Sequence, residues 1–134
     1  MKQEYIINTT KYQKRGFLIF LMVWLVNLSN SQVSLTATGG TTTGSYTTLS
    51  AAFAALNAGT HSGNVNITIT GNTSEPFTPT TLVPPPAGGW ATLNIAPQGS
   101  NITVTSTGIN ANRGLVELFN VKNVTINGDD PNAA

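Results

Sequence analysis

The chain contains no cysteine among its 134 residues and a single histidine, His61. Without cysteine, a disulfide framework, a thiolate zinc site and a cysteine nucleophile are all excluded. One histidine cannot build a multi-histidine metal site, and a catalytic base would need placed partners that the sequence does not supply. Because His61 lies among Gly, Thr and Ser residues, we interpret it as a solvated side chain in a turn.

Charge is also scarce, at 8% of residues, and it is unevenly placed. Four of the six basic residues lie in the first fifteen positions: Lys2, Lys11, Lys14 and Arg15. Beyond residue 31 there are two basic and four acidic residues, a net charge of −2: Arg113, Lys122, Glu75, Glu117, Asp129 and Asp130. This balance excludes a basic nucleic-acid footprint and a polybasic membrane patch beyond the N-terminus.

Residues 1–31 have the pattern of a secretory signal peptide. A basic segment ends at Arg15, residues 16–28 are almost continuously apolar, and small residues follow at Ser29 and Ser31. The alternative is an uncleaved membrane anchor, but a spanning helix needs about 20 apolar residues, and this run has 13. We therefore predict cleavage before Gln32, membrane contact only during export, and a secreted or outer cell-surface location.

One helix is expected in the mature chain, over residues 48–57. Leu49, Phe53 and Leu56 recur at helical spacing, and four alanines between them favour helix. Thr48 or Ser50 can cap its first turn by accepting a backbone N–H bond. Together with an alternating segment at residues 33–37, this helix forms the expected N-terminal region, residues 32–63.

Short strands are expected in the remainder, residues 64–134. Three segments begin with asparagine, alternate aliphatic and polar residues, and end at glycine: 64–71, 101–108 and 123–128. Such alternation is typical of strands with one buried face. Residues 90–95 and 115–119 also read as strands, the latter with Val116 and Leu118 in the core. Residues 71–89, rich in Pro and Gly, are expected to be an insertion between strands.

The strand repeats predict a solenoid. Asn101 and Asn123 are 22 residues apart, about the length of one coil of a right-handed parallel β-helix. The predicted fold is therefore all-β, an incomplete β-helix of few coils, with the helix at 48–57 covering its open N-terminal end. The alternative is a small β-sandwich with the helix packed on its side.

Three segments carry a resemblance to a known family: SYTTLSAAFAALNAG, NVNITITGN and GLVELFNVKNVTINGDD. They resemble the N-terminal portion of secreted right-handed parallel β-helix proteins, which are pectin-lyase-like in fold and common among surface proteins of Bacteroidetes-type bacteria. The resemblance covers about residues 33–130 and implies more coils than this length can form. We therefore expect the chain to be a fragment.

The predicted function is that of a secreted or cell-surface segment with a structural or adhesive role, without catalysis, cofactor or metal. The alternative is the start of a polysaccharide lyase or glycoside hydrolase whose active site lies in missing downstream coils. Enzymes on the resembled fold use carboxylates to hold calcium with an Arg or Lys base, or paired aspartates. The available residues match no such motif: Arg113, Glu117, Lys122, Asp129 and Asp130.

Three aromatic residues are candidate carbohydrate contacts: Tyr46, Phe77 and Trp90. Exposed aromatic side chains can act as binding anchors. The alternative is structural, with Tyr46 fixing the start of the helix and the other two covering the insertion. The expected partners are polysaccharide or cell-surface glycans, with no nucleic acid and no specific protein partner.

Overall fold

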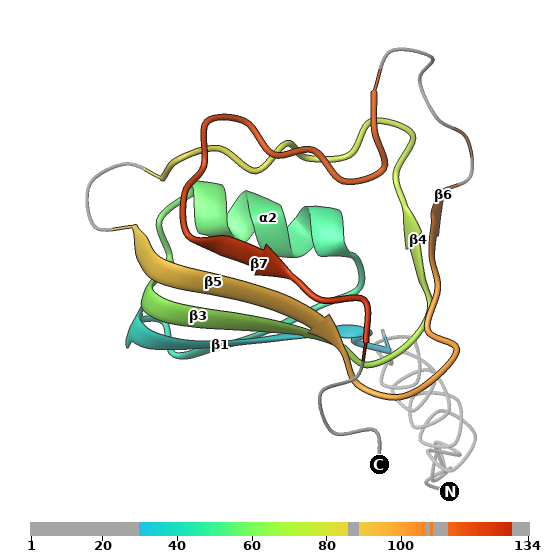
Figure 1. The fold of residues 1–134 in the computed structure, drawn as a ribbon, viewed down its shortest axis with the longest axis horizontal. Coiled ribbons are helices and arrows are strands. Elements are labelled where there is room, and N and C mark those ends of the chain that lie inside the picture. The colour runs from blue at the N-terminus through green and yellow to red at the C-terminus, as the bar shows by residue number, and fades with distance from the viewer. Residues whose placement is uncertain (1–29, 86–88, 107, 109–112, 130–134) are drawn as a thin grey trace, which may run out of the picture. The chain divides into compact units, whose positions relative to one another are not determined.

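The computed structural model describes residues 30–85, 89–106, 108 and 113–129. The chain divides into two units, residues 1–30 and 31–134, and nearly all of the described residues belong to the second. The predicted signal peptide, apart from residues 30 and 31, lies outside the described residues. In its described part, the second unit contains a five-stranded sheet, one helix and a two-stranded sheet (Figure 1).

The five-stranded sheet has the order β2-β1-β3-β5-β7 and mixes two strand directions. Strand β1 (Val33–Gly40) pairs antiparallel with β2 (Thr43–Tyr46) on one side and with β3 (His61–Ile69) on the other. Strand β3 then pairs parallel with β5 (Trp90–Pro97), and β5 pairs parallel with β7 (Val124–Ile126). Among the described strands, β1 and β2 form a local pair, since Leu35 and Gly44 are 9 residues apart. The other pairs join distant segments, as Leu35 pairs with Ile67 in β3 and Val65 pairs with Leu93 in β5.

The core lies on the inner face of this sheet. Side chains of a strand alternate between its two faces, so the aliphatic residue at every second position points the same way. The buried residues contributed by β1, β3 and β5 follow this alternation: Val33, Leu35, Val65, Ile67, Ile69, Leu93 and Ile95. The single buried face predicted from the alternation in residues 64–71 is thus confirmed for β3.

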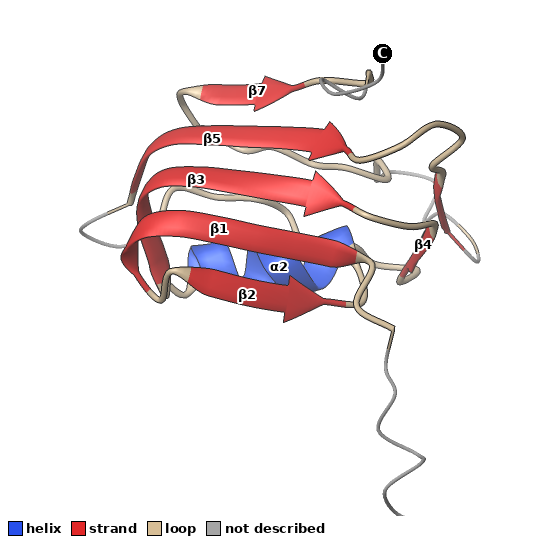
Figure 2. Cartoon of the chain, turned by 90° about the horizontal axis from the view of Figure 1, so that it is seen from below, coloured by secondary structure: helices blue, strands red, loops and turns tan. Residues whose placement is uncertain are grey.

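Helix α2 (Leu49–Asn57) covers the inner face of the sheet, and Figure 2 shows it behind the strands. Phe53 and Leu56 are buried in the core beneath it. Thr48 caps the helix, because its hydroxyl oxygen accepts a hydrogen bond from the backbone N–H of Ala51 at 3.1 Å. The predicted helix is confirmed, and of the two candidate caps Thr48 is the N-cap, whereas Ser50 lies within the helix.

A second, two-stranded parallel sheet joins β4 (Thr73–Glu75) to β6 (Val104–Ser106). A parallel bridge between Leu82 and Leu118 adds one further contact between distant segments. Both β4 and the buried Leu82 belong to the predicted insertion at residues 71–89, of which 86–88 lie outside the described residues. This stretch therefore contributes a strand and a core residue to the fold.

The predicted β-helix is wrong. The strands form a mixed five-stranded sheet and a separate small parallel sheet, not the stacked coils of a solenoid. The antiparallel pairs of β1 with β2 and β3 break the parallel pattern that a solenoid needs. The predicted role of the helix as a cap on the end of the solenoid is also wrong, because α2 packs across the face of the sheet.

The 22-residue spacing between Asn101 and Asn123 does not measure a coil, because the strands that follow these two residues belong to different sheets. Strand β6 follows Asn101 and pairs with β4, whereas β7 follows Asn123 and pairs with β5. The residues that align across the parallel strands are Val65, Leu93 and Val124. The small β-sandwich is also wrong, because a helix and not an antiparallel sheet covers the core.

Two residues predicted for the core lie at the surface instead. Val116 is 36% exposed and Leu118 is 43% exposed. In the described part of the chain, their segment pairs through the single bridge between Leu82 and Leu118, and no neighbouring strand there encloses its side chains. In the part of the chain that the structure describes, no helix has both the length and the apolar character needed to span a membrane.

Candidate functional site

The three candidate carbohydrate contacts lie in different surroundings. Tyr46 ends β2, and its hydroxyl bonds the Nε2 atom of His61 at 2.8 Å. Phe77 follows β4 and is 55% exposed. Trp90 begins β5, where its indole N–H donates to the backbone carbonyl of Lys122 at 3.1 Å.

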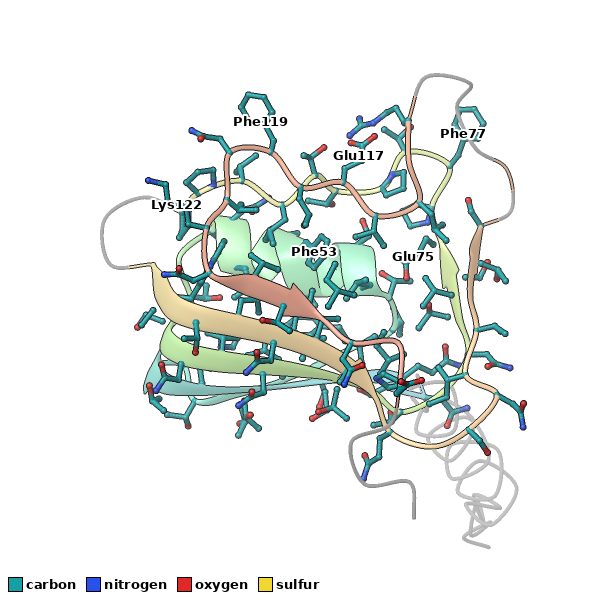
Figure 3. The ribbon with its side chains drawn as sticks, in the orientation of Figure 1. Phe53, Glu75, Phe77, Glu117, Phe119 and Lys122 are labelled. Carbon is teal, nitrogen blue, oxygen red and sulfur yellow. The ribbon has the colours of Figure 1, made fainter. Side chains whose placement is uncertain are left out.

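The structure does not bring these three aromatic residues together. Figure 3 shows Phe77 and Lys122 at opposite ends of the unit, so Phe77 is remote from the Trp90 indole that bonds Lys122. Tyr46 is committed to His61 and is only partly exposed. A single platform of three rings is not formed, and sugar contact by any one of them stays a prediction.

Trp90 lines a groove of about 350 Å³, which we call the Trp90 groove. Its other residues come from the chain before β5 and from the segment before β7: Pro84, Pro85, Gly89, Asn120, Val121, Lys122 and Asn123. The indole and the two proline rings give it apolar walls. The two asparagines and the lysine add hydrogen-bonding groups to its lining.

The backbone conformation explains two of the polar groups in the Trp90 groove. Asn120 and Asn123 have φ angles of 54° and 57°, in the left-handed region that asparagine tolerates better than most residues. The amide of Asn123 also donates to the backbone carbonyl of Ala91 at 3.0 Å. This bond ties the groove to β5 and leaves the amide oxygen of Asn123 as an acceptor.

His61 is buried, with 2% of its surface exposed, so the predicted solvated turn residue is wrong. Its Nδ1 atom bonds the backbone carbonyl of Thr41, which can only accept, so this nitrogen carries the proton. In the neutral ring, the Nε2 atom accepts a hydrogen bond from the hydroxyl of Tyr46. Both ring nitrogens are occupied, and the imidazole serves to join β3 to β2 and to the turn before it.

Glu75 is a buried carboxylate that sequence reasoning left without a role. It is 1% exposed and accepts backbone N–H bonds from Leu49 at 2.9 Å and from Ser50 at 2.8 Å. The first turn of α2 has unpaired N–H groups and a partial positive charge, so a carboxylate there is stabilising. No local signal reveals this contact, because the partners are 25 and 26 residues apart.

Arg113 and Glu117 form an ion pair near the surface. The Nε atom of Arg113 donates to both carboxylate oxygens, at 2.9 and 3.0 Å, and the hydroxyl of Thr81 donates to one of them at 2.6 Å. Hydrogen bonds from Arg113, then from Thr81, lower the pKa of Glu117 from 4.5 to about 2. The same carboxylate raises the pKa of Arg113.

The acidic residues of the described segments are separately engaged or dispersed. Glu75 binds the helix, Glu117 binds Arg113, and Asp129 is exposed, while Asp130 lies outside the described residues. Within the described ranges, no three His, Asp or Glu side chains gather to hold a metal ion. Comparisons with protein-family models, curated proteins and solved structures found no match for this chain.

Proposed function

We propose that the protein is a secreted or cell-surface module with a structural or adhesive role, which attaches to polysaccharide or cell-surface glycans through the Trp90 groove. The observation that carries this proposal is the groove itself, with its indole and two proline rings beside three polar side chains. Ligand sites combine apolar walls with a few placed polar groups in this way.

The chemistry of the groove suits a sugar. The apolar rings of Trp90, Pro84 and Pro85 can pack against the C–H faces of a pyranose ring. Amide groups both donate and accept hydrogen bonds, which matches the hydroxyl groups of a glycan. The indole N–H of Trp90 is already bonded to the Lys122 carbonyl, so the ring is held in place before a ligand arrives.

Secretion rests on the pattern of residues 1–31, whose basic start, apolar run and small-residue exit are those of a signal peptide. The compact unit that begins at Ser31 is compatible with cleavage at the predicted position before Gln32. Mass spectrometry of the protein recovered from culture medium or the cell surface tests this. We expect a chain starting at Gln32, and a cell-retained protein starting at Met1 would contradict export.

Glycan attachment is tested by substitution of Trp90. Immobilised polysaccharides and a glycan array would be probed with the wild type and with Trp90→Ala, and we expect at least a ten-fold loss of affinity, as for an aromatic anchor. Phe119→Ala is the matched control, because it removes an aromatic ring that is exposed and does not line the groove. Equal binding by all three proteins would overturn the role of the groove.

A further inference from the structure

The outer face of the five-stranded sheet carries a row of neutral polar side chains. One residue from each strand falls in the same register: Thr43, Thr36, Asn66, Asn94 and Thr125. All five are exposed. With neighbouring strands about 4.8 Å apart, the row extends roughly 19 Å across the sheet.

A second row runs beside the first. It contains three hydroxyl side chains and one small apolar residue, again aligned by strand register: Ser45, Ser34, Thr68 and Ala96. Figure 2 looks onto this side of the sheet, with α2 on the far side. Among the described residues no element packs over these two rows, which we call the polar sheet face.

The polar sheet face is uncharged, which is unusual for an exposed surface of this size. Folded proteins commonly make their surfaces soluble with a mixture of Lys, Arg, Glu and Asp. Between residues 30 and 106 the only charged side chain is Glu75, and it is buried against α2. The polarity of the face therefore comes from hydroxyl and amide groups alone.

Bonds between neighbouring strands order these side chains. The amide nitrogen of Asn94 donates to the side-chain oxygen of Asn66 at 3.1 Å. Beside them, the hydroxyl of Thr92 donates to the side-chain oxygen of Asn64, also at 3.1 Å. A ligand that meets an ordered array loses less side-chain freedom on binding than one that must immobilise long, flexible groups.

We infer that the polar sheet face is a second contact surface, and that its ligand is a neutral, hydroxyl-rich polysaccharide chain lying across the strands. An acidic polymer or a nucleic acid would need cations that the face lacks. A protein partner would need buried aromatic or arginine anchors, and neither row contains one. The hydroxyl and amide groups of the polar sheet face can both donate and accept hydrogen bonds, and so can the hydroxyl groups of a neutral polysaccharide.

This inference rests on the proposed function, since it adds a second surface to the same attachment. Single neutral hydrogen bonds contribute little, so binding depends on many contacts made together. Affinity should therefore rise with the length of the polymer. It should also be unchanged by salt, because no charges take part.

The test measures retention of the full protein on microcrystalline cellulose, amylose resin and insoluble β-1,3-glucan, with polygalacturonate as a charged comparison. Asn66→Ala combined with Asn94→Ala should reduce retention on a neutral polymer about ten-fold. Thr36→Val combined with Thr43→Val is a second variant, which keeps side-chain shape and strand preference while removing two hydroxyls. Ser74→Ala combined with Thr103→Ala is the control, because both residues are exposed and lie off this face.

The outcomes separate the two proposals. Retention on a neutral polymer that is insensitive to salt and lost in both face variants, but not in the control, supports the inference. Retention that falls only with Trp90→Ala, or that occurs only on polygalacturonate, overturns it and leaves the proposed function standing. Absence of retention on every polymer overturns both.

Discussion

Hydrogen bonds from Arg113, Thr81 and Gly114 converge on the carboxylate of Glu117. Arg113 lies four residues before Glu117, but Thr81 lies 36 residues away. The local part of this arrangement is readable from the sequence as a nearby pair of opposite charges. The contact with Thr81 is not readable in this way, because it forms where the parallel bridge brings Leu82 beside Leu118.

The lowered pKa of Glu117 makes stability depend on pH in a defined window. The unfolded chain takes up a proton near 4.5, whereas the folded chain resists it down to about 2. Between these values the unfolded state binds more protons, so the stabilising contribution, complete above 4.5, is lost as pH falls towards 2. We expect denaturant unfolding curves of the wild type to show this loss.

Glu117→Gln should have a flatter dependence of unfolding free energy on pH over the same window. Arg113→Met should also flatten it, because the main cause of the low pKa is then removed. The measurement is the unfolding midpoint at several pH values between 5 and 2. Identical slopes in the wild type and both variants would contradict the assignment of the shift to this ion pair.

At the scale of elements, two side chains accept hydrogen bonds from the backbone N–H groups of the first turn of α2. Thr48 accepts the N–H of Ala51, and Glu75 accepts those of Leu49 and Ser50. The first contact is local and is predictable from the position of threonine before the periodic apolar residues. The second depends on β4 and could not be predicted, because nothing near Glu75 indicates that it faces a helix terminus.

Thr48→Ala should destabilise the protein by about 1 kcal/mol, the usual contribution of an N-cap side chain. Thr47→Ala is the matched control, since Thr47 is the adjacent exposed threonine and should change stability by less than about 0.5 kcal/mol. Urea unfolding followed by circular dichroism measures both. An equal loss in the two variants would show that the effect is one of threonine removal rather than capping.

At the scale of the whole folded unit, the last strand of the sheet leaves an open edge. Among the described residues, strand β7 pairs only with β5, and Ile126 is 54% exposed. A hollow of about 200 Å³ lies beside it, lined largely by aliphatic residues that include Ile69, Ile95 and Ile126. Open strand edges with exposed apolar side chains favour association between molecules.

Ile126→Lys should therefore reduce self-association at high concentration, because it places a charge at this edge. Gln98→Lys is the control for net charge, since Gln98 is exposed and lies outside the hollow. Light scattering over a concentration series distinguishes them. A reduction of similar size in both variants would indicate a general charge effect and would argue against the β7 edge.

The sequence by itself determined the local features of this protein. The spacing of Leu49, Phe53 and Leu56 specifies an amphipathic helix, and the alternation of Val65, Ile67 and Ile69 specifies a strand with one buried face. These signals are local, since each depends on residues within a few positions of one another. For the same reason they do not state which strands pair or in which direction.

Only the tertiary structure decided the pairing of the strands and the place of the polar groups. The sheet mixes antiparallel and parallel neighbours, and its parallel partners lie about 30 residues apart in the chain, so no short repeat encodes them. His61 and Glu75 are buried because their partners come from distant segments. The rows of neutral side chains on the outer face likewise depend on the tertiary structure, because they form only when the five strands pair in this order and register.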